Sequence, residues 1–262
     1  MFEIGNRGNV GLIRHCIKQI DRVLFFGGIR LACVLVSHLI RLQKLREGAL
    51  ARFQFVVFTD DLSEKFVEAG SDKGLLPSAS GLPGHRYSAV YQSLFWAYRE
   101  KQFAMLEIGI GTNKADQVSN MGVDGCVGAS LQVWERFFRQ ANIYAFDIDQ
   151  LGFVGNARIK TGVADQTDKC QVETCMKQFE DPSFSIVIDD GLHTPQGNQK
   201  AFENLGPWLA PGAVYVIEDI HSSNLQEMAH WAQQLRLSYC FYISDKWEDE
   251  NSNLMVIHCG GF

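Results

Sequence analysis

The sequence has no closely spaced pair of cysteines. Its seven cysteines are scattered over 262 residues, and no two of them have the CxxC spacing. Zinc sites and disulfide frameworks rely on such spacing, so the sequence favours reduced thiols and a cytoplasmic location over either class. Internal repeats and low-complexity segments are also lacking. With 46% hydrophobic and 21% charged residues, the composition is typical of one large globular α/β domain with an appendage.

A long uninterrupted apolar run is missing as well. The most apolar stretch, Val23–Ile40, is broken by Gly27, Gly28 and Arg30 and by two further polar residues. It is too short and too polar for a confident transmembrane helix. It also begins behind Asp21, which is late for a signal peptide. Three interpretations remain: a helix packed on the core, a dimer arm, or an interfacial helix facing anionic lipid.

Most of the chain lacks an excess of basic residues. The first 52 residues hold nine of the 24 Lys and Arg and three of the 30 Asp and Glu, which leaves 15 basic and 27 acidic residues for the remainder. Phosphate binding needs a basic surface, so the acidic body argues against a nucleic acid substrate. We expect a mostly helical N-terminal segment over residues 1–82, with a possible strand at Phe53–Phe58. Its basic charge would suit a peripheral membrane contact. A second domain should cover residues 83–262 and open with a helix over His85–Glu100.

One glycine turn dominates the second domain. Met105–Thr112 reads MLEIGIGT, an apolar run that leads into Gly109 and Gly111. Glycines at such a turn let a ligand approach the backbone. The third glycine of GxGxxG is absent, and Glu107 would repel a pyrophosphate. The turn therefore suits a cationic ligand such as a sulfonium amino acid better than a dinucleotide, although glycine turns after strands are also common without any ligand.

Further apolar runs follow the turn, and each ends in acidic or polar residues. They are Asn142–Asp149, Ile159–Asp165, Phe184–Asp190 and Ala213–Asp219. Continuous apolar runs of this kind indicate parallel strands buried on both faces. Asp147 is placed where an acid binds a ribose, or is simply a solvated strand end. Thr194 and Pro195 predict a helix start. Leu237–Ile243 and Leu254–His258 predict two final strands.

Four carboxylates end two consecutive strands. Asp189 and Asp190 follow one, and Glu218 and Asp219 follow the next. Consecutive strands are usually neighbours, so these side chains should converge, and clustered carboxylates repel one another without a cation or proton. We interpret Asp190, Glu218 and Asp219 as a divalent metal site, with Asp189 turned towards the cofactor. Helix capping and solvated loop acids are the alternative for each acid alone.

A histidine lies three positions after Asp190. In DDGLH, Gly191 permits a tight turn that would place His193 over the acids. A neutral imidazole there could accept the proton of an acceptor hydroxyl, which makes His193 the candidate catalytic base. A structural histidine bonded to a backbone carbonyl is the alternative. His221, in EDIH, is a weaker candidate for the same role or for a supporting one.

Taken together, these motifs resemble one known family. The resemblance rests on LEIGIGT, GASLQVWERFF, IYAFDID, DQTD, IDDGLH and PGAVYVIEDI, with SDKG and HRY upstream, and covers about Ser71 to His221. These segments are similar to the class I S-adenosylmethionine-dependent O-methyltransferases of the macrocin and mycinamicin type. The family's fold is Rossmann-like, a mostly parallel seven-stranded sheet with helices on both faces. Leu192, VADQTD and the insert Asn113–Gly128 depart from the family pattern.

The resemblance implies a role for each matching residue. Glu107, Gly109 and Gly111 would hold the methionine end of the cofactor, and Asp147 the ribose. Asp165 and Gln166 would flank the adenine. The implied magnesium ligands are Asp190, Glu218 and Asp219, and the implied base is His193.

These residues together predict a definite reaction. We expect an S-adenosylmethionine- and Mg²⁺-dependent O-methyltransferase that acts on a sugar hydroxyl of a glycosylated natural product or cell-surface glycan precursor. It would displace the methyl group directly and work as a homo-oligomer. A nicotinamide-dependent oxidoreductase and a non-catalytic cofactor-binding scaffold are the alternatives.

Overall fold

The computed structural model describes residues 32–36, 54–58, 61–79, 81, 83–114, 121, 125–149, 155–243 and 251–260. The chain divides into two compact units, Met1–Asp61 and Leu62–Phe262. The second unit thus begins earlier in the chain than the expected boundary at residue 82. Leu62 and Phe66 of helix α2 (Asp61–Ala69) explain this, because both are fully buried in a core shared with the main sheet.

The first unit contains a two-stranded sheet. Strand β1 (Ala32–Val36) pairs antiparallel with β2 (Gln54–Phe58), and Val34 lies opposite Val56. The strand expected near Phe53–Phe58 is therefore present. The expectation of a helix over Val23–Ile40 is wrong for Ala32–Val36, which forms a strand. Its sequence, ACVLV, contains β-branched residues, and it pairs with QFVVF, which also favours a strand. The rest of that stretch lies outside the described residues.

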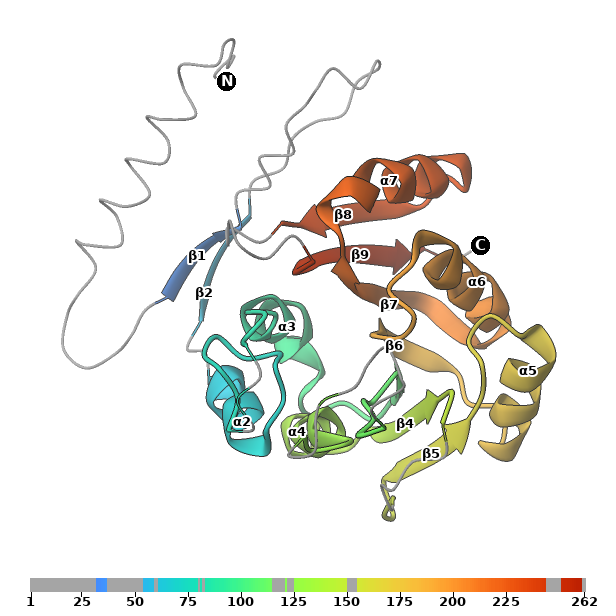
Figure 1. Ribbon diagram of the computed structural model, residues 1–262, viewed down its shortest axis with the longest axis horizontal. Helices are drawn as coiled ribbons and strands as arrows, with labels where there is room; N and C mark the ends of the chain where they lie inside the picture. Colours follow the sequence, from blue (N-terminus) through green and yellow to red (C-terminus); the bar gives the residue numbers. More distant parts are fainter. Residues whose placement is uncertain are drawn as a thin grey trace, which may run out of the picture. The chain divides into compact units, whose positions relative to one another are not determined.

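The second unit is built on a seven-stranded sheet in the order β5-β4-β3-β6-β7-β9-β8 (Figure 1). Its strands are β3 (Ala104–Ile108), β4 (Asn142–Asp147), β5 (Ile159–Val163), β6 (Phe184–Asp189), β7 (Leu209–Ile220), β8 (Ser238–Tyr242) and β9 (Asn253–Cys259). Only β9 runs against the others, since it pairs antiparallel with both β7 and β8. The prediction of a mostly parallel sheet is confirmed, and the reversed β9 makes it a mixed one.

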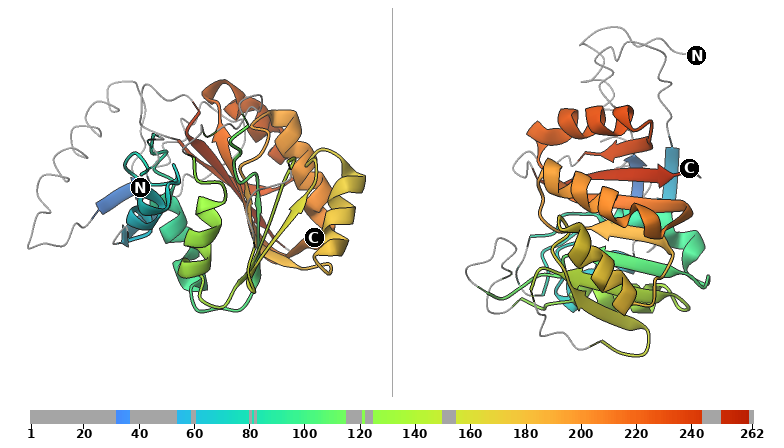
Figure 2. Two further views of the ribbon diagram at one scale, coloured as in Figure 1. Left: turned by 60° about the horizontal axis from the view of Figure 1, so that its bottom comes forward. Right: turned by 90° about the vertical axis from the view of Figure 1, so that its right-hand side faces the viewer.

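Helices cover both faces of the sheet (Figure 2). One face carries α5 (Lys169–Gln178), α6 (Pro195–Leu205) and α7 (Leu225–Gln234), and the other carries α2, α3 (Ser88–Phe95) and α4 (Ala129–Phe137). Short 3₁₀ helices are η1 (Trp96–Tyr98), η2 (Gly206–Trp208) and η3 (Ser222–Asn224). Successive strand residues point to opposite faces, so each apolar strand feeds both cores.

The helix starts follow their capping residues. Thr194 precedes α6, and its Oγ1 accepts a hydrogen bond from the backbone N–H of Gly197, as the Thr-Pro signal predicts. Asp168 caps α5 in the same way, accepting from Cys170 and Gln171. The helix expected over His85–Glu100 is shorter and spans Ser88–Phe95 before η1.

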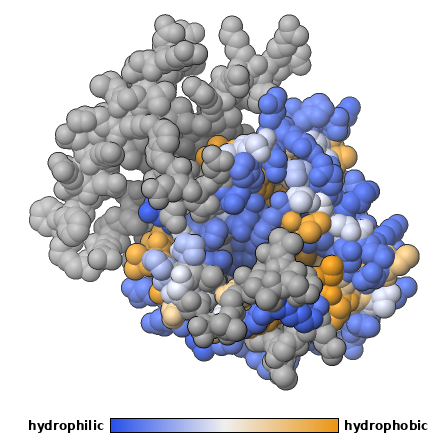
Figure 3. Space-filling model, viewed as in Figure 1, coloured by the Kyte–Doolittle hydropathy of each residue, from blue (hydrophilic) through white to orange (hydrophobic). Residues whose placement is uncertain are grey.

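The described residues show no single large apolar face on the side drawn in Figure 3. In the view of Figure 3, most residues are hydrophilic and the hydrophobic ones form small separate groups. Large apolar side chains that are exposed come from several elements: Leu76, Trp96, Ile148, Val163, Leu192, Leu235 and Ile243. Among the described residues, no helix is both long and apolar enough to cross a membrane.

Candidate active site

A pocket opens at the carboxyl ends of β3, β4 and β5. Its lining residues come from four strand-end loops: Ile108, Gly109, Thr112, Asp147, Ile148, Asp149, Ala164, Asp165, Gln166, Thr167, Gly191 and Leu192. Four of the residues predicted to bind cofactor are therefore brought together: Gly109, Asp147, Asp165 and Gln166. In an open α/β sheet, this is the edge at which ligands bind.

The glycine turn is packed tightly against its neighbours. Gly109 and Gly111 have φ angles of 75° and 81°, in the left-handed region that favours glycine. A Cβ on Gly109 would lie 2.1 Å from the carbonyl oxygen of Asp190, and one on Gly111 would lie 2.0 Å from Sδ of Met121. Gly111 is not among the pocket-lining residues. The neighbouring atoms and the positive φ angles both act against a side chain at either position, so both positions favour glycine. Gly109 also borders the pocket.

Asp147 fixes the turn from the end of β4. Its Oδ2 accepts a hydrogen bond of 2.9 Å from the backbone N–H of Ile110, and its Oδ1 accepts one of 3.3 Å from Asp149. Burial raises the pKa of the carboxyl group above its ordinary value. The side chain lines the pocket, where its remaining lone pairs could accept from ribose hydroxyls.

Gln166 ties the pocket wall to the acid loop. Its Oε1 accepts from the backbone N–H of Leu192 at 2.9 Å, while its Nε2 donates to Asp189 at 3.2 Å. Asp165 stays local, since its Oδ1 accepts from the backbone and hydroxyl of Thr167. Both residues line the pocket as the sequence predicts, but the amide of Gln166 is already used to hold the loop.

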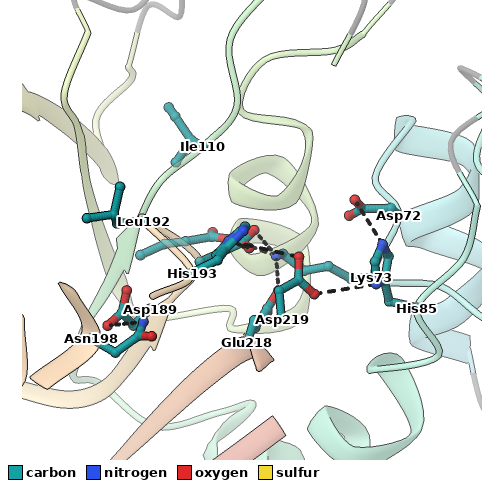
Figure 4. A network of polar contacts seen from close by, with 12 residues as sticks. Asp72, Lys73, His85, Ile110, Asp189, Leu192, His193, Asn198, Glu218 and Asp219 are labelled. Carbon is teal, nitrogen blue, oxygen red and sulfur yellow. Dashed lines mark hydrogen bonds and ion pairs between the residues drawn. The ribbon is translucent and has the colours of Figure 1, made fainter. Parts of the chain in front are cut away.

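Asp189 does not line the pocket. It is fully buried and accepts a hydrogen bond from Asn198 (Figure 4). It also accepts hydrogen bonds from Tyr215 and Gln166. Burial raises the pKa of its carboxyl group to about 6. Its alternation with Asp190 along the strand end turns it towards α6. The expected cofactor contact of Asp189 stays a prediction, and its partners favour a role in holding the loop.

Glu107 is also fully buried and does not line the pocket. Its Oε2 accepts from the hydroxyl of Ser130 at 3.0 Å, and its Oε1 lies 3.6 Å from Nζ of Lys73. Burial raises the pKa of Glu107 to about 7, although the lysine opposes the rise. An interaction with a cationic cofactor remains a prediction, because a cation from the chain already lies beside this carboxylate.

A second group of polar side chains lies beside the pocket. One ligand atom each from Asp190, His193 and Asp219 fits within 4.8 Å of the others, and Figure 4 shows His193 and Asp219 side by side. His193 and Asp219 both have positive φ angles, of 55° and 53°. Non-glycine residues adopt this conformation rarely and usually at functional sites. Two carboxylates at this distance are donors that fit a divalent cation, and the imidazole lies beside them.

Glu218 is placed differently from the expectation. It is buried, its Oε2 accepts a 2.6 Å hydrogen bond from Lys73, and its Oε1 accepts one from the hydroxyl of Tyr91. Lys73 also donates to Oδ2 of Asp190 at 2.6 Å. Of the three predicted metal ligands, Asp190 and Asp219 thus meet at the cluster, joined by His193. Both oxygens of Glu218 are taken by residues of the chain itself.

Residues from the segment before β3 complete this group, and the sequence patterns did not predict their role. Lys73 is 2% exposed; burial would lower its pKa, but Asp190, Glu218 and Glu107 raise it well above its ordinary value. Tyr87 donates to Asp219 at 2.5 Å. Tyr87 and Tyr91 are core residues, but their hydroxyls reach the acids.

His85 extends the group outwards. Its Nδ1 lies 3.4 Å from Asp219 and its Nε2 3.7 Å from Asp72. The segments SDKG and HRY were noticed for their resemblance alone. No periodicity or spacing marks a single lysine or histidine in a loop, so the fold was needed to place them.

His193 depends on Asp190 for its protonation. Its Nε2 lies 3.1 Å from Oδ1 of Asp190 and 3.9 Å from Asp219. Burial lowers the pKa of the imidazole, but the hydrogen bond and charge of Asp190 outweigh it and raise the pKa to about 9. The imidazole of the metal-free protein is therefore protonated at neutral pH. His221 is used elsewhere, as Nδ1 caps η3 by accepting from the backbone of Ser223.

The chain was compared with known proteins. No protein-family model matches it. It is 34% identical over 141 residues to the 8-demethyl-8-alpha-L-rhamnosyl tetracenomycin-C 2'-O-methyltransferase of Streptomyces olivaceus, covering 53% of this chain and 34% of the relative. It is 35% identical over 136 residues to the mycinamicin VI 2''-O-methyltransferase of Micromonospora griseorubida, covering 52% of this chain and 32% of the relative. The chain thus matches about one third of the length of these curated relatives.

A similar solved structure is the MycE methyltransferase of the mycinamycin biosynthetic pathway, in complex with Mg and SAH. The likeness has a TM-score of 0.56 at 26% identity and covers 76% of this chain and 55% of that one. These findings agree with the motifs and with the fold of the second unit. Over about half of its length in sequence, and over three quarters in structure, the chain is similar to the sugar O-methyltransferases of the macrocin and mycinamicin type.

Proposed function

We propose that this protein transfers a methyl group from S-adenosylmethionine to a sugar hydroxyl with the help of a divalent cation. One observation carries the proposal: the pocket and the acid cluster share a single loop. Gly191 and Leu192 line the pocket, and they lie between Asp190 and His193 of the cluster. A cofactor in the pocket and an acceptor at the cluster would therefore meet across four residues of chain.

The similar proteins support both parts of this proposal. The MycE structure contains Mg and SAH, and a second MycE structure also contains mycinamycin VI. The curated relatives are named as O-methyltransferases of sugar-bearing natural products. The acceptor of this chain would accordingly be a glycosylated molecule, with a sugar hydroxyl as the group that is methylated.

Different residues would bind the cofactor, bind the cation and accept the proton. The turn at Gly109 and the carboxylate of Asp147 would seat the cofactor, and Asp190, Glu218 and Asp219 are the proposed ligands of the cation. A bound divalent cation supplies a Lewis acid that lowers the pKa of a hydroxyl group. His193 would accept the hydroxyl proton at Nε2. It can do so only when neutral, which requires that the charge of Asp190 be taken up by the cation.

Further expectations concern the location and the partners of the protein. The unpaired cysteines of the described residues, such as Cys175 and Cys259, agree with a cytoplasmic location. The acidic body agrees with the absence of a nucleic acid partner. Self-association and a membrane contact were expected from the first unit, most of which lies outside the described residues, and they stay predictions.

Calorimetry tests the cofactor. S-Adenosylhomocysteine should bind and NAD should not, and Asp147→Ala should weaken S-adenosylhomocysteine binding by tenfold or more, on the order of one lost charge-assisted hydrogen bond pair. Asp181→Ala is the control, because Asp181 is an exposed carboxylate that accepts from Trp208 and does not line the pocket. Tight NAD binding without any response to S-adenosylhomocysteine would remove the proposal.

Chelation tests the cation. Activity on sugar acceptors should vanish with excess chelator and return with Mg²⁺, while S-adenosylhomocysteine still binds. With Mg²⁺ present, Asp219→Asn should lose most turnover and still bind S-adenosylhomocysteine. Full turnover in excess chelator would show that the acids serve as structural groups or as bases.

A further inference from the structure

The acid cluster contains a cation that belongs to the chain itself. Nζ of Lys73 lies 2.6 Å from Asp190, 2.6 Å from Glu218 and 3.6 Å from Glu107. The side chain is 2% exposed. Burying an ammonium group is costly unless carboxylates compensate it, so these three acids explain why Lys73 can be inside.

The position of Lys73 is fixed by its backbone. Its carbonyl oxygen accepts a hydrogen bond of 2.8 Å from the N–H of Ser88, at the start of α3. The next residue, Gly74, accepts one of 2.8 Å from Arg86, and a Cβ on Gly74 would lie 2.8 Å from a methyl group of Val67. The ammonium is thus delivered by a segment anchored between α2 and α3, and it is not a surface side chain that folds inwards.

The two ligands that touch Lys73 are held by a complete set of partners. Asp190 is bonded by Lys73 on Oδ2 and lies beside His193 on Oδ1. Glu218 is bonded by Lys73 on Oε2 and by Tyr91 on Oε1. Without the lysine, the buried Glu218 and the half-buried Asp190 would face each other with no positive charge of the chain between them, and like charges at such sites repel.

We propose that Lys73 is the resident counter-cation of the acid cluster: it holds Asp190 and Glu218 in place before a divalent cation binds, and it lowers their affinity for that cation. The inference rests on the divalent cation site of the proposed function and adds a residue that opposes it. Lys73 is a positioning residue, because it touches the acids rather than the acceptor. A divalent cation that engages Asp190 or Glu218 has to compete with an ammonium at 2.6 Å.

Cation binding without cofactor or acceptor tests this directly. Mn²⁺ affinity is measured at pH 8 by paramagnetic resonance and calorimetry on the wild type, on Lys73→Met and on Lys200→Met. Lys73→Met should bind Mn²⁺ roughly tenfold more tightly or better, because the substitution removes a positive charge that lies 2.6 Å from two carboxylates of the proposed site. Lys200→Met should match the wild type, because Lys200 is a surface lysine paired with Glu203.

Thermal melts give a second readout that does not involve activity. Lys73→Met should melt earlier than the wild type without metal, because its acids are uncompensated. Saturating Mg²⁺ should then raise its Tm by more than it raises that of the wild type, since a ligand stabilises the state that binds it more tightly. Equal or smaller metal-induced shifts in Lys73→Met would overturn the inference.

A charge-balanced pair of variants covers the case in which Lys73→Met does not fold. Glu218→Gln is compared with Lys73→Met/Glu218→Gln, which loses one charge of each sign and keeps Asp190, His193 and Asp219. The double variant should bind Mn²⁺ more tightly than Glu218→Gln, and equal or weaker binding contradicts the role of Lys73. If the wild type and every variant leave Mn²⁺ unbound, the proposed cation site fails first, and the inference falls with it.

Discussion

The two halves of the candidate site lie at the same edge of the sheet but use their side chains in opposite ways. In the pocket half, at the ends of β3, β4 and β5, Asp147 and Asp165 border open space. In the acid half, at the ends of β6 and β7, Asp190, Glu218 and Asp219 are each engaged by other side chains. The pocket half is shaped to receive a ligand, whereas the acid half is stabilised by the chain in advance.

The difference follows from where the partners originate. The described residues that line the pocket belong to strand ends and the loops that follow them, each next to the motif that marks it. The acid half is completed from a segment far away in sequence, since Lys73 lies 117 residues from Asp190 and 145 from Glu218. A substitution in the pocket half should therefore affect cofactor binding. A substitution in the acid half should affect turnover, the response to metal and stability.

The largest effect should come from His193→Ala. Turnover should fall by roughly two to four orders of magnitude, the usual contribution of a general base. Affinity for S-adenosylhomocysteine should stay unchanged, because the imidazole faces Asp190 and Asp219 rather than the pocket. The loss should shrink at high pH, where hydroxyl groups ionise with less help. Steady-state kinetics from pH 6 to 10 and calorimetry measure both quantities.

His221→Ala is the matched control for that variant. Its ring caps η3, and turnover should remain close to that of the wild type. A His193→Ala protein that melts earlier and loses cofactor affinity together with activity would identify His193 as a structural residue. The distinction between the two halves would then fail at this loop.

Glu107 should make the stability depend on pH. Its pKa is raised to about 7 from 4.5, chiefly by burial, so the folded state holds a proton that the unfolded state has lost. The stability contribution is therefore complete below pH 4.5, and it declines as pH rises through about 7. The loss is at most about 3 kcal/mol. Urea unfolding between pH 4.5 and 8 should show a flatter profile for Glu107→Gln, and parallel profiles would contradict the assignment.

Tyr91→Phe probes the pre-formed contacts of the acid half. The variant leaves Oε1 of the buried Glu218 without the hydroxyl that donates to it. Such an unsatisfied group costs about 1–3 kcal/mol. Tyr239→Phe is the control, because its hydroxyl accepts from Gln233 at the surface. Denaturant unfolding compares the two, and an equal loss in both would show that the contact with Glu218 contributes nothing special.

The smallest effect is expected from Thr194→Ala. The change removes the cap of α6 that follows the acid loop, at a cost of about 1 kcal/mol. Thr194→Ser keeps the hydroxyl and should keep most of the stability. Since Thr194 lies outside the pocket lining, S-adenosylhomocysteine affinity should not change. Weaker cofactor binding in Thr194→Ala would mean that the two halves are less separate than their partners suggest.

The sequence predicted the pocket half better than the acid half for a physical reason. Buried parallel strands must be continuously apolar, so their ends are visible as the first polar residues, and Asp147 was predicted in this way. Gly109 was predicted from the glycine turn, and the role of Gln166 was implied by the family resemblance. The two final strands and the capped start of α6 follow equally local rules and are confirmed.

The errors and omissions involve choices that only tertiary contacts decide. Ala32–Val36 is a strand because it has a partner in β2, while its composition also allows a helix. Glu218 follows a strand end as predicted, yet Lys73 and Tyr91 determine where its oxygens point. Asp189 and Asp190 are adjacent in sequence, but the pleat sends one to α6 and the other to the cluster.

The contact between Gly109 and the carbonyl oxygen of Asp190 has a consequence for protein engineering. A Cβ at position 109 would lie 2.1 Å from that oxygen, so the two turns meet backbone to backbone with no side chain to absorb a mismatch. A loop graft that imports a new glycine turn from another methyltransferase has to import the DDG turn with it. The two loops form a single transplantable module, and chimeras that divide it should express poorly whatever the quality of either half.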